Sequence, residues 1–210
     1  MQPNNSTRIP VNVYAESTPN PAAMKFVCSM MLLHEGSVEY FSPEEASASP
    51  LAASLFRFSG IRAVFITSNF ITVQKDGETD WYEIVNIIRE FIRGHLMEGG
   101  KVFISNPFEG QKKNTEVPEP STAQAAPAAV PVDPELNDKI RGLLEEYVKP
   151  AVEQDGGAIE FRSFSEGVVT VALKGSCSGC PSSTMTLKSG IENLLKGMLP
   201  EVREVVAESE

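Results

Sequence analysis

Two cysteines separated by two residues are the part of this sequence most able to do chemistry. Cys177 and Cys180 lie in the stretch "GSCSGCPSS", residues 175–183, among glycines and serines. Two thiolates at this spacing supply half of a tetrahedral metal site, or the attacking and resolving groups of a dithiol redox centre. Because their neighbours are small, we expect both sulfur atoms to be exposed and the backbone to allow close approach of a ligand.

The position of Pro181 favours shared metal binding over redox exchange. Proline lacks an N–H and fits the first position of a helix, so we expect Cys180 to be the N-cap and Cys177 to lie in the preceding loop. The positive end of that helix would favour thiolates. Since the proline follows both cysteines, both sulfurs can point outward together, which suits coordination better than attack and resolution. A dithiol redox module and a zinc-bridged structural dimer are the alternative hypotheses.

Other candidate ligands lie far away along the chain. Residues 135–210 contain no histidine and no third cysteine, so this segment does not complete a four-ligand zinc or iron–sulfur site. Cys28 has the apolar neighbours of a small core residue, His95 lies on the apolar face of a predicted helix, and we expect His34 in a loop. The simplest completion is a second copy of the same loop, because a two-fold dimer would bring four thiolates together.

Composition and charge exclude several classes of protein. The chain has 210 residues and a formal net charge of −10, so its surface would repel a phosphate backbone and we expect no nucleic-acid partner. Three cysteines are too few for a disulfide framework, which indicates a reducing compartment. With no signal or transit sequence visible and no apolar run of about 18–20 residues, we expect a cytoplasmic protein of bacterial type without a membrane segment.

A change of composition after residue 104 divides the chain. Residues 105–134 contain six prolines and, after Phe108, no large apolar side chain except isolated valines. Such a segment does not bury a core, so we expect a flexible, partly polyproline linker. It would join two small α+β domains, residues 1–104 and residues 135–210.

The first domain is predicted to contain five strands and two helices. Alternating and β-branched patterns predict strands over 11–17, 22–30, 37–41, 61–67 and 70–75, with a hairpin turn at Ser68–Asn69. Ser49 and Asp80 stand at favourable N-cap positions for helices over 49–58 and roughly 81–96. We expect Trp81 to anchor the second helix to the sheet.

The second domain is predicted to have the order αββαβ. Helices open at Asp133–Pro134 and at Pro181, and strands cover 158–164, 168–174 and 201–207. Asp155 precedes two glycines and indicates a turn, and the hydroxyls of residues 182–184 are expected to satisfy the first helical turn. Helical spacing places the following side chains in the core: Ile140, Leu143, Leu144, Tyr147, Val148, Met185, Leu187, Ile191, Leu194, Leu195 and Met198.

Both halves of the sequence resemble one known family. Over residues 136–206, which include "DGG" at 155–157 and "GSCSGCPSS", the chain is similar to the C-terminal domain of NifU-like (Nfu-type) iron–sulfur scaffold and carrier proteins. The stretches "TPNPAAMKF", "SPLAASLFRFSGIRAVFITSNFITVQK" and "DWYEIVNIIREFI" resemble the Nfu N-terminal domain. The combination of the glycine pair with the CxxC stretch makes this resemblance specific.

The resemblance implies a carrier protein and not an enzyme. Cys177 and Cys180 match the family's cluster ligands, which hold a [4Fe-4S] cluster between two subunits. The cluster would come from upstream assembly proteins and pass to apo-protein clients by ligand exchange, with the N-terminal domain as a targeting or regulatory module. Cys28 matches no family ligand, and the linker is longer and richer in proline than in compact members.

Overall fold

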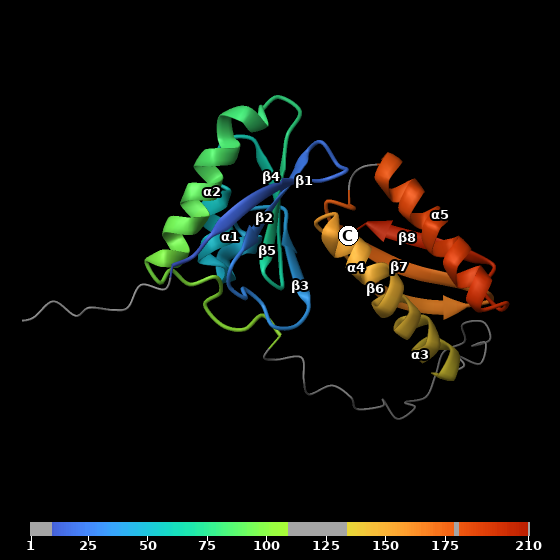
Figure 1. Cartoon of the computed structure of the whole chain (residues 1–210). Coiled ribbons are helices and arrows are strands. Elements are labelled where there is room, and N and C mark those ends of the chain that lie inside the picture. The colour runs from blue at the N-terminus through green and yellow to red at the C-terminus, as the bar shows by residue number, and fades with distance from the viewer. Residues whose placement is uncertain (1–9, 109–133, 179–180, 210) are drawn as a thin grey trace, which may run out of the picture. The chain divides into compact units, whose positions relative to one another are not determined.

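The chain forms two compact units, residues 1–107 and residues 108–210. The computed structural model describes residues 10–108, 134–178 and 181–209 (Figure 1). Each unit combines a β-sheet with helices, which confirms the predicted α+β class. Most of the predicted linker, residues 109–133, lies outside the described residues, so its extent stays a prediction.

The first unit is built on a five-stranded antiparallel sheet with the order β1-β2-β5-β4-β3. Its strands are β1 (Val13–Ser17), β2 (Ala23–Cys28), β3 (Ser37–Tyr40), β4 (Ile61–Thr67) and β5 (Phe70–Lys75). All five predicted strands are therefore confirmed. The β4–β5 hairpin turns at Ser68 and Asn69, as predicted, with Ser68 in the left-handed region at φ 41°.

Two capped helices pack on one face of this sheet. Helix α1 (Pro50–Leu55) follows a 3₁₀ turn (Glu45–Ala48), and Ser49 accepts the N–H of Ala52 at its N-terminus. This helix is shorter than the predicted 49–58, because the chain turns through Gly60, at φ 84°, to enter β4.

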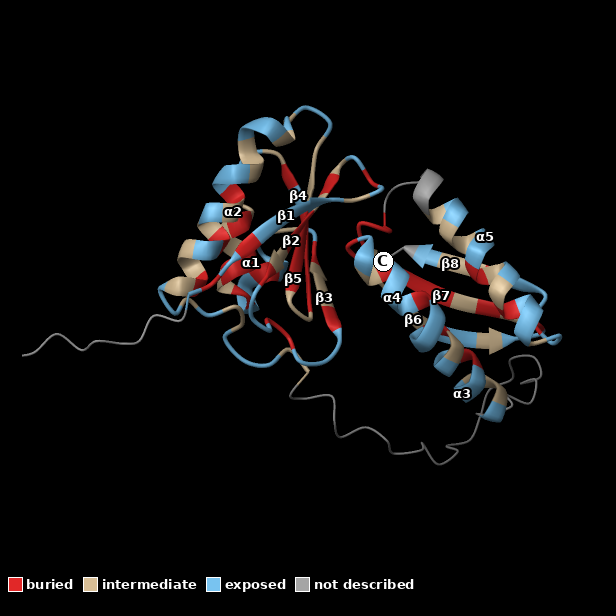
Figure 2. Cartoon of the chain, in the orientation of Figure 1, coloured by how far each residue is buried: buried red, intermediate tan, exposed pale blue. Residues whose placement is uncertain are grey.

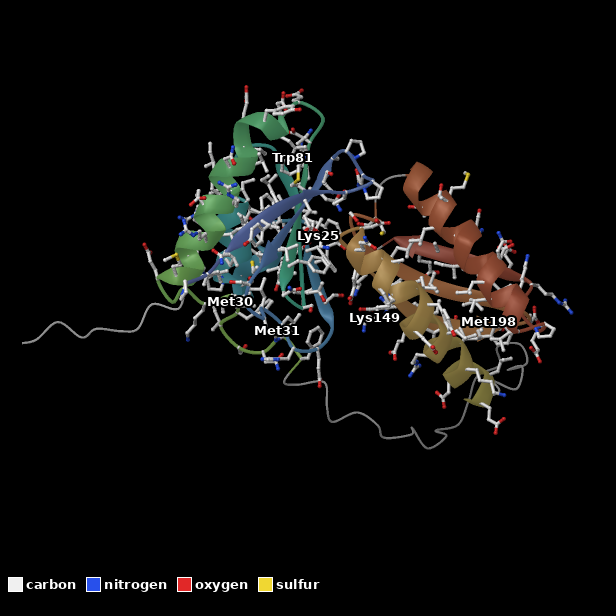
Figure 3. The ribbon with its side chains drawn as sticks, viewed as in Figure 1. Lys25, Met30, Met31, Trp81, Lys149 and Met198 are labelled. Atoms are coloured by element: carbon white, nitrogen blue, oxygen red, sulfur yellow. The ribbon has the colours of Figure 1, made fainter. Side chains whose placement is uncertain are left out.

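Helix α2 (Trp81–Met97) is fixed to the sheet at its first residue. Asp80 accepts the N–H of Tyr82, which confirms the predicted cap. The indole N–H of Trp81 donates to the carbonyl of Pro21 at 3.0 Å (Figure 3), so Trp81 anchors the start of this helix as expected. The core between helices and sheet contains, among others, Leu51, Leu55, Ile88, Ile92, Phe26, Val64, Ile66, Ile71 and Cys28.

The second unit has the predicted αββαβ order. Its helices are α3 (Pro134–Leu143), a π-helical turn (Leu144–Val148), α4 (Lys149–Gln154) and α5 (Pro181–Met198), and its strands are β6 (Gly157–Ser165), β7 (Val168–Gly175) and β8 (Glu204–Ser209). The β6–β7 hairpin turns at Glu166 and Gly167, with φ values of 52° and 84°. Strand β8 returns parallel to β7.

All helices of the second unit cover the same face of its sheet. Figure 2 shows that most of β7 is buried. Its alternate residues Val169, Val171 and Leu173 belong to one hydrophobic cluster with side chains of the helices. That cluster includes Ile140, Leu144, Val148, Val152, Ile191 and Leu195. The opposite face carries polar side chains, among them Glu160 and Lys174, whose Oε1 and Nζ lie 3.1 Å apart.

The prediction that Tyr147 is a core residue is wrong, since its side chain is 49% exposed. The buried residues Ile140, Leu144, Val148 and Val152 follow one another at intervals of four. In a regular α-helix a step of four residues goes about 40° beyond a full turn, so three steps would rotate this stripe of buried side chains by about 120° around the helix axis. The wider π turn removes most of that rotation and keeps the stripe on the sheet, so Tyr147 faces outward.

The predicted core positions of Met185 and Met198 are also wrong, because these side chains are 70% and 47% exposed. The buried side of α5 passes through Ile191 and Leu195. Met185 lies six residues before Ile191, which places it about 120° around the helix from Ile191, and it is close to the start of α5. Met198 is the last residue of α5, where the following Leu199 packs against the core.

Candidate metal centre

The CxxC stretch connects the central strand of the second unit to its longest helix. Strand β7 ends at Gly175 and α5 begins at Pro181, which confirms the predicted helix start. Cys177 lies two residues after the strand. Gly179 and Cys180 lie outside the described residues, so the predicted N-cap role of Cys180 stays a prediction.

Cys177 is buried, contrary to the expectation that its sulfur would be exposed. The residue is 5% exposed and belongs to the hydrophobic core cluster of the second unit. The neighbouring strand accounts for this burial, because Gly157, the first residue of β6, lies against Cys177. A Cβ atom placed on Gly157 would lie 2.7 Å from Sγ of Cys177 and 2.7 Å from the carbonyl oxygen of Lys174. The small residue at position 157 makes room for the sulfur of Cys177 and for the neighbouring backbone.

The glycine pair at 156–157 is therefore part of the site and not a turn alone. Asp155 follows the end of α4, and Gly156 takes φ 82°, a left-handed conformation that glycine adopts without strain. Gly157 then pairs with Gly175 at the end of β7. The sequence predicted a turn at these residues but not the packing of Gly157 against the sulfur of Cys177. The signal for that packing was the second glycine, because the left-handed turn needs glycine only at position 156.

Hydrogen bonds fix the loop to this turn. Ser176 donates its N–H to the carbonyl of Gly156 at 3.2 Å, and its hydroxyl donates to the carbonyl of Asp155. Ser178 donates its hydroxyl to the carbonyl of Gly175 at 2.7 Å and its N–H to the same oxygen at 3.1 Å. The two serines around Cys177 are thus structural residues that hold the loop in its bend.

Thr184 connects the loop to the helix. Its hydroxyl donates to the carbonyl of Cys177 at 3.0 Å. The hydroxyls of residues 182–184 were expected to satisfy the first turn of the helix; the side chains of residues 182 and 183 lie outside the described part of the chain, so for them this stays a prediction. Thr184 also reaches back to the backbone of Cys177. The position of Cys177 is therefore set from two directions, by the glycine turn and by the first turn of α5.

Known protein families match both units of the chain. Residues 13–99 match the family model described as "Scaffold protein Nfu/NifU N terminal", and residues 140–206 match the "NifU-like domain". A NifU-like protein of Schizosaccharomyces pombe is 34% identical over 92% of this chain and 71% of that protein. The chain belongs to the NifU-like family. The resemblance seen in the sequence is confirmed.

A further relative covers both domains, and a solved structure covers half of the chain. A human protein named "NFU1 iron-sulfur cluster scaffold homolog, mitochondrial" is 34% identical over 92% of this chain and 70% of its own length. Among solved structures, the solution NMR structure of a NifU-like protein from Saccharomyces cerevisiae is 25% identical and covers 50% of this chain and 93% of that chain, with a TM-score of 0.42.

The start of helix α5 contributes positive charge to the CxxC loop of the NifU-like domain. Residues 175–187 include no charged side chain, and the nearest lysine before them, Lys174, lies 3.1 Å from Glu160. The 18-residue helix α5 directs the positive end of its dipole toward the loop, which favours thiolates and other anions there.

The remaining candidate ligands, Cys28, His34 and His95, lie in the Nfu N-terminal domain. Cys28 is 2% exposed at the end of β2, which confirms its assignment to the core, and burial raises the pKa of its thiol to about 12. Nε2 of His95 lies 3.0 Å from the carbonyl oxygen of Lys101, and His34 is exposed in a loop. Within the described residues, no three His, Cys, Asp or Glu side chains form a metal-binding group.

Proposed function

We propose that this NifU-like protein is an iron–sulfur cluster carrier. In this proposal Cys177 and Cys180 bind a [4Fe-4S] cluster shared between two copies of the chain, which then pass it to apo-proteins. The observation that carries the proposal is a cysteine pair that, in the sequence, directly precedes the first residue of the 18-residue helix α5, whose positive end favours thiolates. Within the described residues, no three His, Cys, Asp or Glu side chains could hold a metal ion together. The printed name of the human relative, an iron–sulfur cluster scaffold homolog, supports it.

The surroundings of Cys177 suit a cluster held by thiolates. The loop carries no charged side chain, and the helix terminus favours the net negative charge of a thiolate-bound centre. Coordination requires Cys177 to leave its buried position, so the hydrogen bonds of Ser176, Ser178 and Thr184 must loosen. Each contributes about 1 kcal/mol, which is small beside the binding free energy of thiolate metal sites, about 10–16 kcal/mol for structural zinc.

Sharing the cluster between two chains makes release possible. A client thiolate forms a bond to an iron atom as the bond from Cys177 or Cys180 to that iron breaks, and the released thiolate takes up a proton. No oxidation or reduction is needed for this exchange. Because each chain contributes half of the ligands, separation of the two copies leaves neither with a complete site.

The proposed partners are apo iron–sulfur proteins and the assembly proteins that supply the cluster. In this proposal the first unit selects clients while the second delivers the cluster. Among the described residues, no helix has the length and apolar character needed to cross a membrane. The cytoplasmic location expected from the sequence stays a prediction, since the human relative is named as mitochondrial.

Anaerobic reconstitution with iron and sulfide tests the function. We expect about two irons per chain, as one cluster shared by two chains requires, and a shift from monomer to dimer measured by light scattering. Cys177→Ala and Cys180→Ala should each lose most of the iron. Cys28→Ala is the matched control and should load normally, because the Cys28 thiol is buried in the first unit and its raised pKa of about 12 keeps it protonated.

Other outcomes would assign another function. A Cys177→Ala variant that holds a full cluster would show that the ligand assignment is wrong. A reversible Cys177–Cys180 disulfide with disulfide-reductase activity and no bound iron would indicate the dithiol redox module. Stoichiometric zinc that chelators remove only as the protein unfolds would indicate a zinc-bridged structural dimer.

A further inference from the structure

We propose that the side of α5 around Met185 is the surface on which a second copy of this chain docks when two CxxC loops share a cluster. This inference rests on the proposed function and adds the interface that the function requires. It starts from the exposed methionine that the sequence pattern had placed in the core.

Met185 combines apolar character with high exposure beside the site. Its side chain is 70% exposed, and it lies four residues after the start of α5, about 6 Å along the helix axis. The next residue toward the loop, Thr184, donates to the carbonyl of Cys177 at 3.0 Å. A single exposed apolar side chain is common on protein surfaces, so its position next to an incomplete site is what makes it informative.

The sharing of a cluster brings this part of the helix into contact. Metal–thiolate bonds are only about 2.3 Å long, so two loops that hold one cluster approach each other within the width of that cluster. The first turns of both α5 helices must then lie at the contact between the copies. A client could also touch this face, but the second copy has to be present first, because one chain supplies only two thiolates.

The same side of α5 continues as a line of small and polar residues. Met185, Ser189 and Asn193 follow one another at intervals of four and are all exposed. Met185 lies about 120° around the helix from the buried Ile191, and Ser189 and Asn193 lie about 160° from it. Ser189 has a short side chain, so it lets a neighbouring backbone approach. Met185 is the one large apolar side chain in this line, and burying it would contribute most of the contact energy.

The charge of this side suits contact with an identical surface. A two-fold axis brings like side chains near one another, so a charged face would repel its copy. From Pro181 to Lys196 the charged residues are Lys188, Glu192 and Lys196. Each has a partner in the same chain: Nζ of Lys188 lies 3.5 Å from Oε1 of Glu204, and Nζ of Lys196 lies 2.5 Å from Oε1 of Glu192, so this side carries no net charge of one sign. By contrast, the exposed residues of α3, the π turn and α4 include Glu135, Glu145, Glu146, Lys149 and Asp138.

Met198 provides a matched control within the same helix. It is also an exposed methionine, 47% exposed, and it lies at the opposite end of α5 (Figure 3). Thirteen residues separate the two methionines, which corresponds to about 20 Å along the helix axis. A substitution at Met198 therefore tests the effect of changing an exposed methionine on α5 away from the loop.

The test uses the full-length chain, loaded anaerobically with iron and sulfide, in four variants: Met185→Gln, Met185→Glu, Ser189→Glu and Met198→Glu. Iron content and the dimer dissociation constant are measured together, the latter by sedimentation. We expect Met185→Gln to weaken the loaded dimer about ten-fold, from the loss of apolar burial, and both glutamate variants near the loop to weaken it more. Met198→Glu should behave like the unchanged protein, and far-UV circular dichroism should show that all four fold.

The outcomes separate this proposal from the function on which it rests. If the unchanged protein and the Met185 and Ser189 variants all load and dimerise equally, the interface is wrong and the cluster-carrier function stands. If the unchanged protein loads a cluster as a monomer, the second copy is wrong. If the variants dimerise normally but transfer the cluster more slowly, the face belongs to a client instead. If the unchanged protein takes up no iron, both proposals are wrong.

Discussion

At the scale of single residues, Gly157 shows how a cysteine can be positioned from a strand to which it does not belong. A side chain at this position would overlap the sulfur of Cys177 and the carbonyl oxygen of Lys174. The φ angle of Gly157 is not in the left-handed region, unlike that of Gly156. Gly157 is therefore required for space, while Gly156 is required for conformation.

We predict that Gly157→Ala destabilises the second unit by about 1–3 kcal/mol, because the inserted methyl group must push apart a strand and the cysteine loop. Gly142→Ala is the matched control: Gly142 lies in α3 with no atom within 4 Å of an added Cβ, so alanine should stabilise by about 0.5–1 kcal/mol. Amide hydrogen exchange at Val171 and Leu173 of β7 measures both changes. Equal effects of the two substitutions would refute the packing role of Gly157.

The sequence predicted some of these residue-scale features and missed others. The helix start at Pro181 and the burial of Cys28 follow from local rules, since proline fits the first helical turn and apolar neighbours surround Cys28. The burial of Cys177 does not follow from its own stretch, because glycines and serines are equally compatible with an exposed loop. It depends on Gly157, a residue twenty positions earlier that only the fold brings next to the sulfur.

At the scale of elements, the α3–α4 segment depends on a single π turn. Four-residue spacing of Ile140, Leu144, Val148 and Val152 keeps all four buried only because the turn at Leu144–Val148 is wider than an α-helical turn. Such turns correspond to one additional residue within an otherwise regular helix. The exposed residues of the turn include Glu145, Glu146 and Tyr147.

We predict that deletion of Glu146 is tolerated, with the stability of the second unit changing by less than about 1 kcal/mol. The spacing of the buried residues would become four, three and four, which rotates the stripe by only about 20° in a regular α-helix. Insertion of one alanine after Glu146 is the control and should cost about 2–5 kcal/mol, because Ile140 or Val152 would turn out of the core. Thermal unfolding followed by circular dichroism compares the two, and a deletion as harmful as the insertion would contradict this account.

Element types could be predicted from the sequence more completely than side-chain directions. Within the described residues, all eight strands and the four helical segments, α1, α2, α3–α4 and α5, follow from apolar period, caps and turn residues. The outward positions of Tyr147, Met185 and Met198 do not, because helical spacing assumes a regular helix that is covered along its whole length. One π turn and two helix ends were enough to change which side chains reach the sheet.

At the scale of the whole molecule, the two units have different roles in the proposed function. Each has its own sheet and its own hydrophobic core, so each has the means to fold by itself. Among the described residues, the candidate ligand Cys177 lies in the second unit. In the first unit Cys28 is a core residue, His95 contacts the carbonyl oxygen of Lys101, and His34 is exposed in a loop. Cluster loading should therefore be a property of the second unit, and client choice a property that the first unit adds.

We predict that residues 134–210, expressed alone, load about two irons per chain and dimerise on loading like the full-length protein. Residues 10–107, expressed alone, should fold but bind no iron, and the fluorescence of Trp81 reports the folding of that fragment. NMR spectra of each fragment, superimposed on that of the full chain, check that the cores are unchanged. If the second fragment folds but fails to load while the full chain succeeds, the first unit must supply a ligand, and the two-thiol account of the site is wrong.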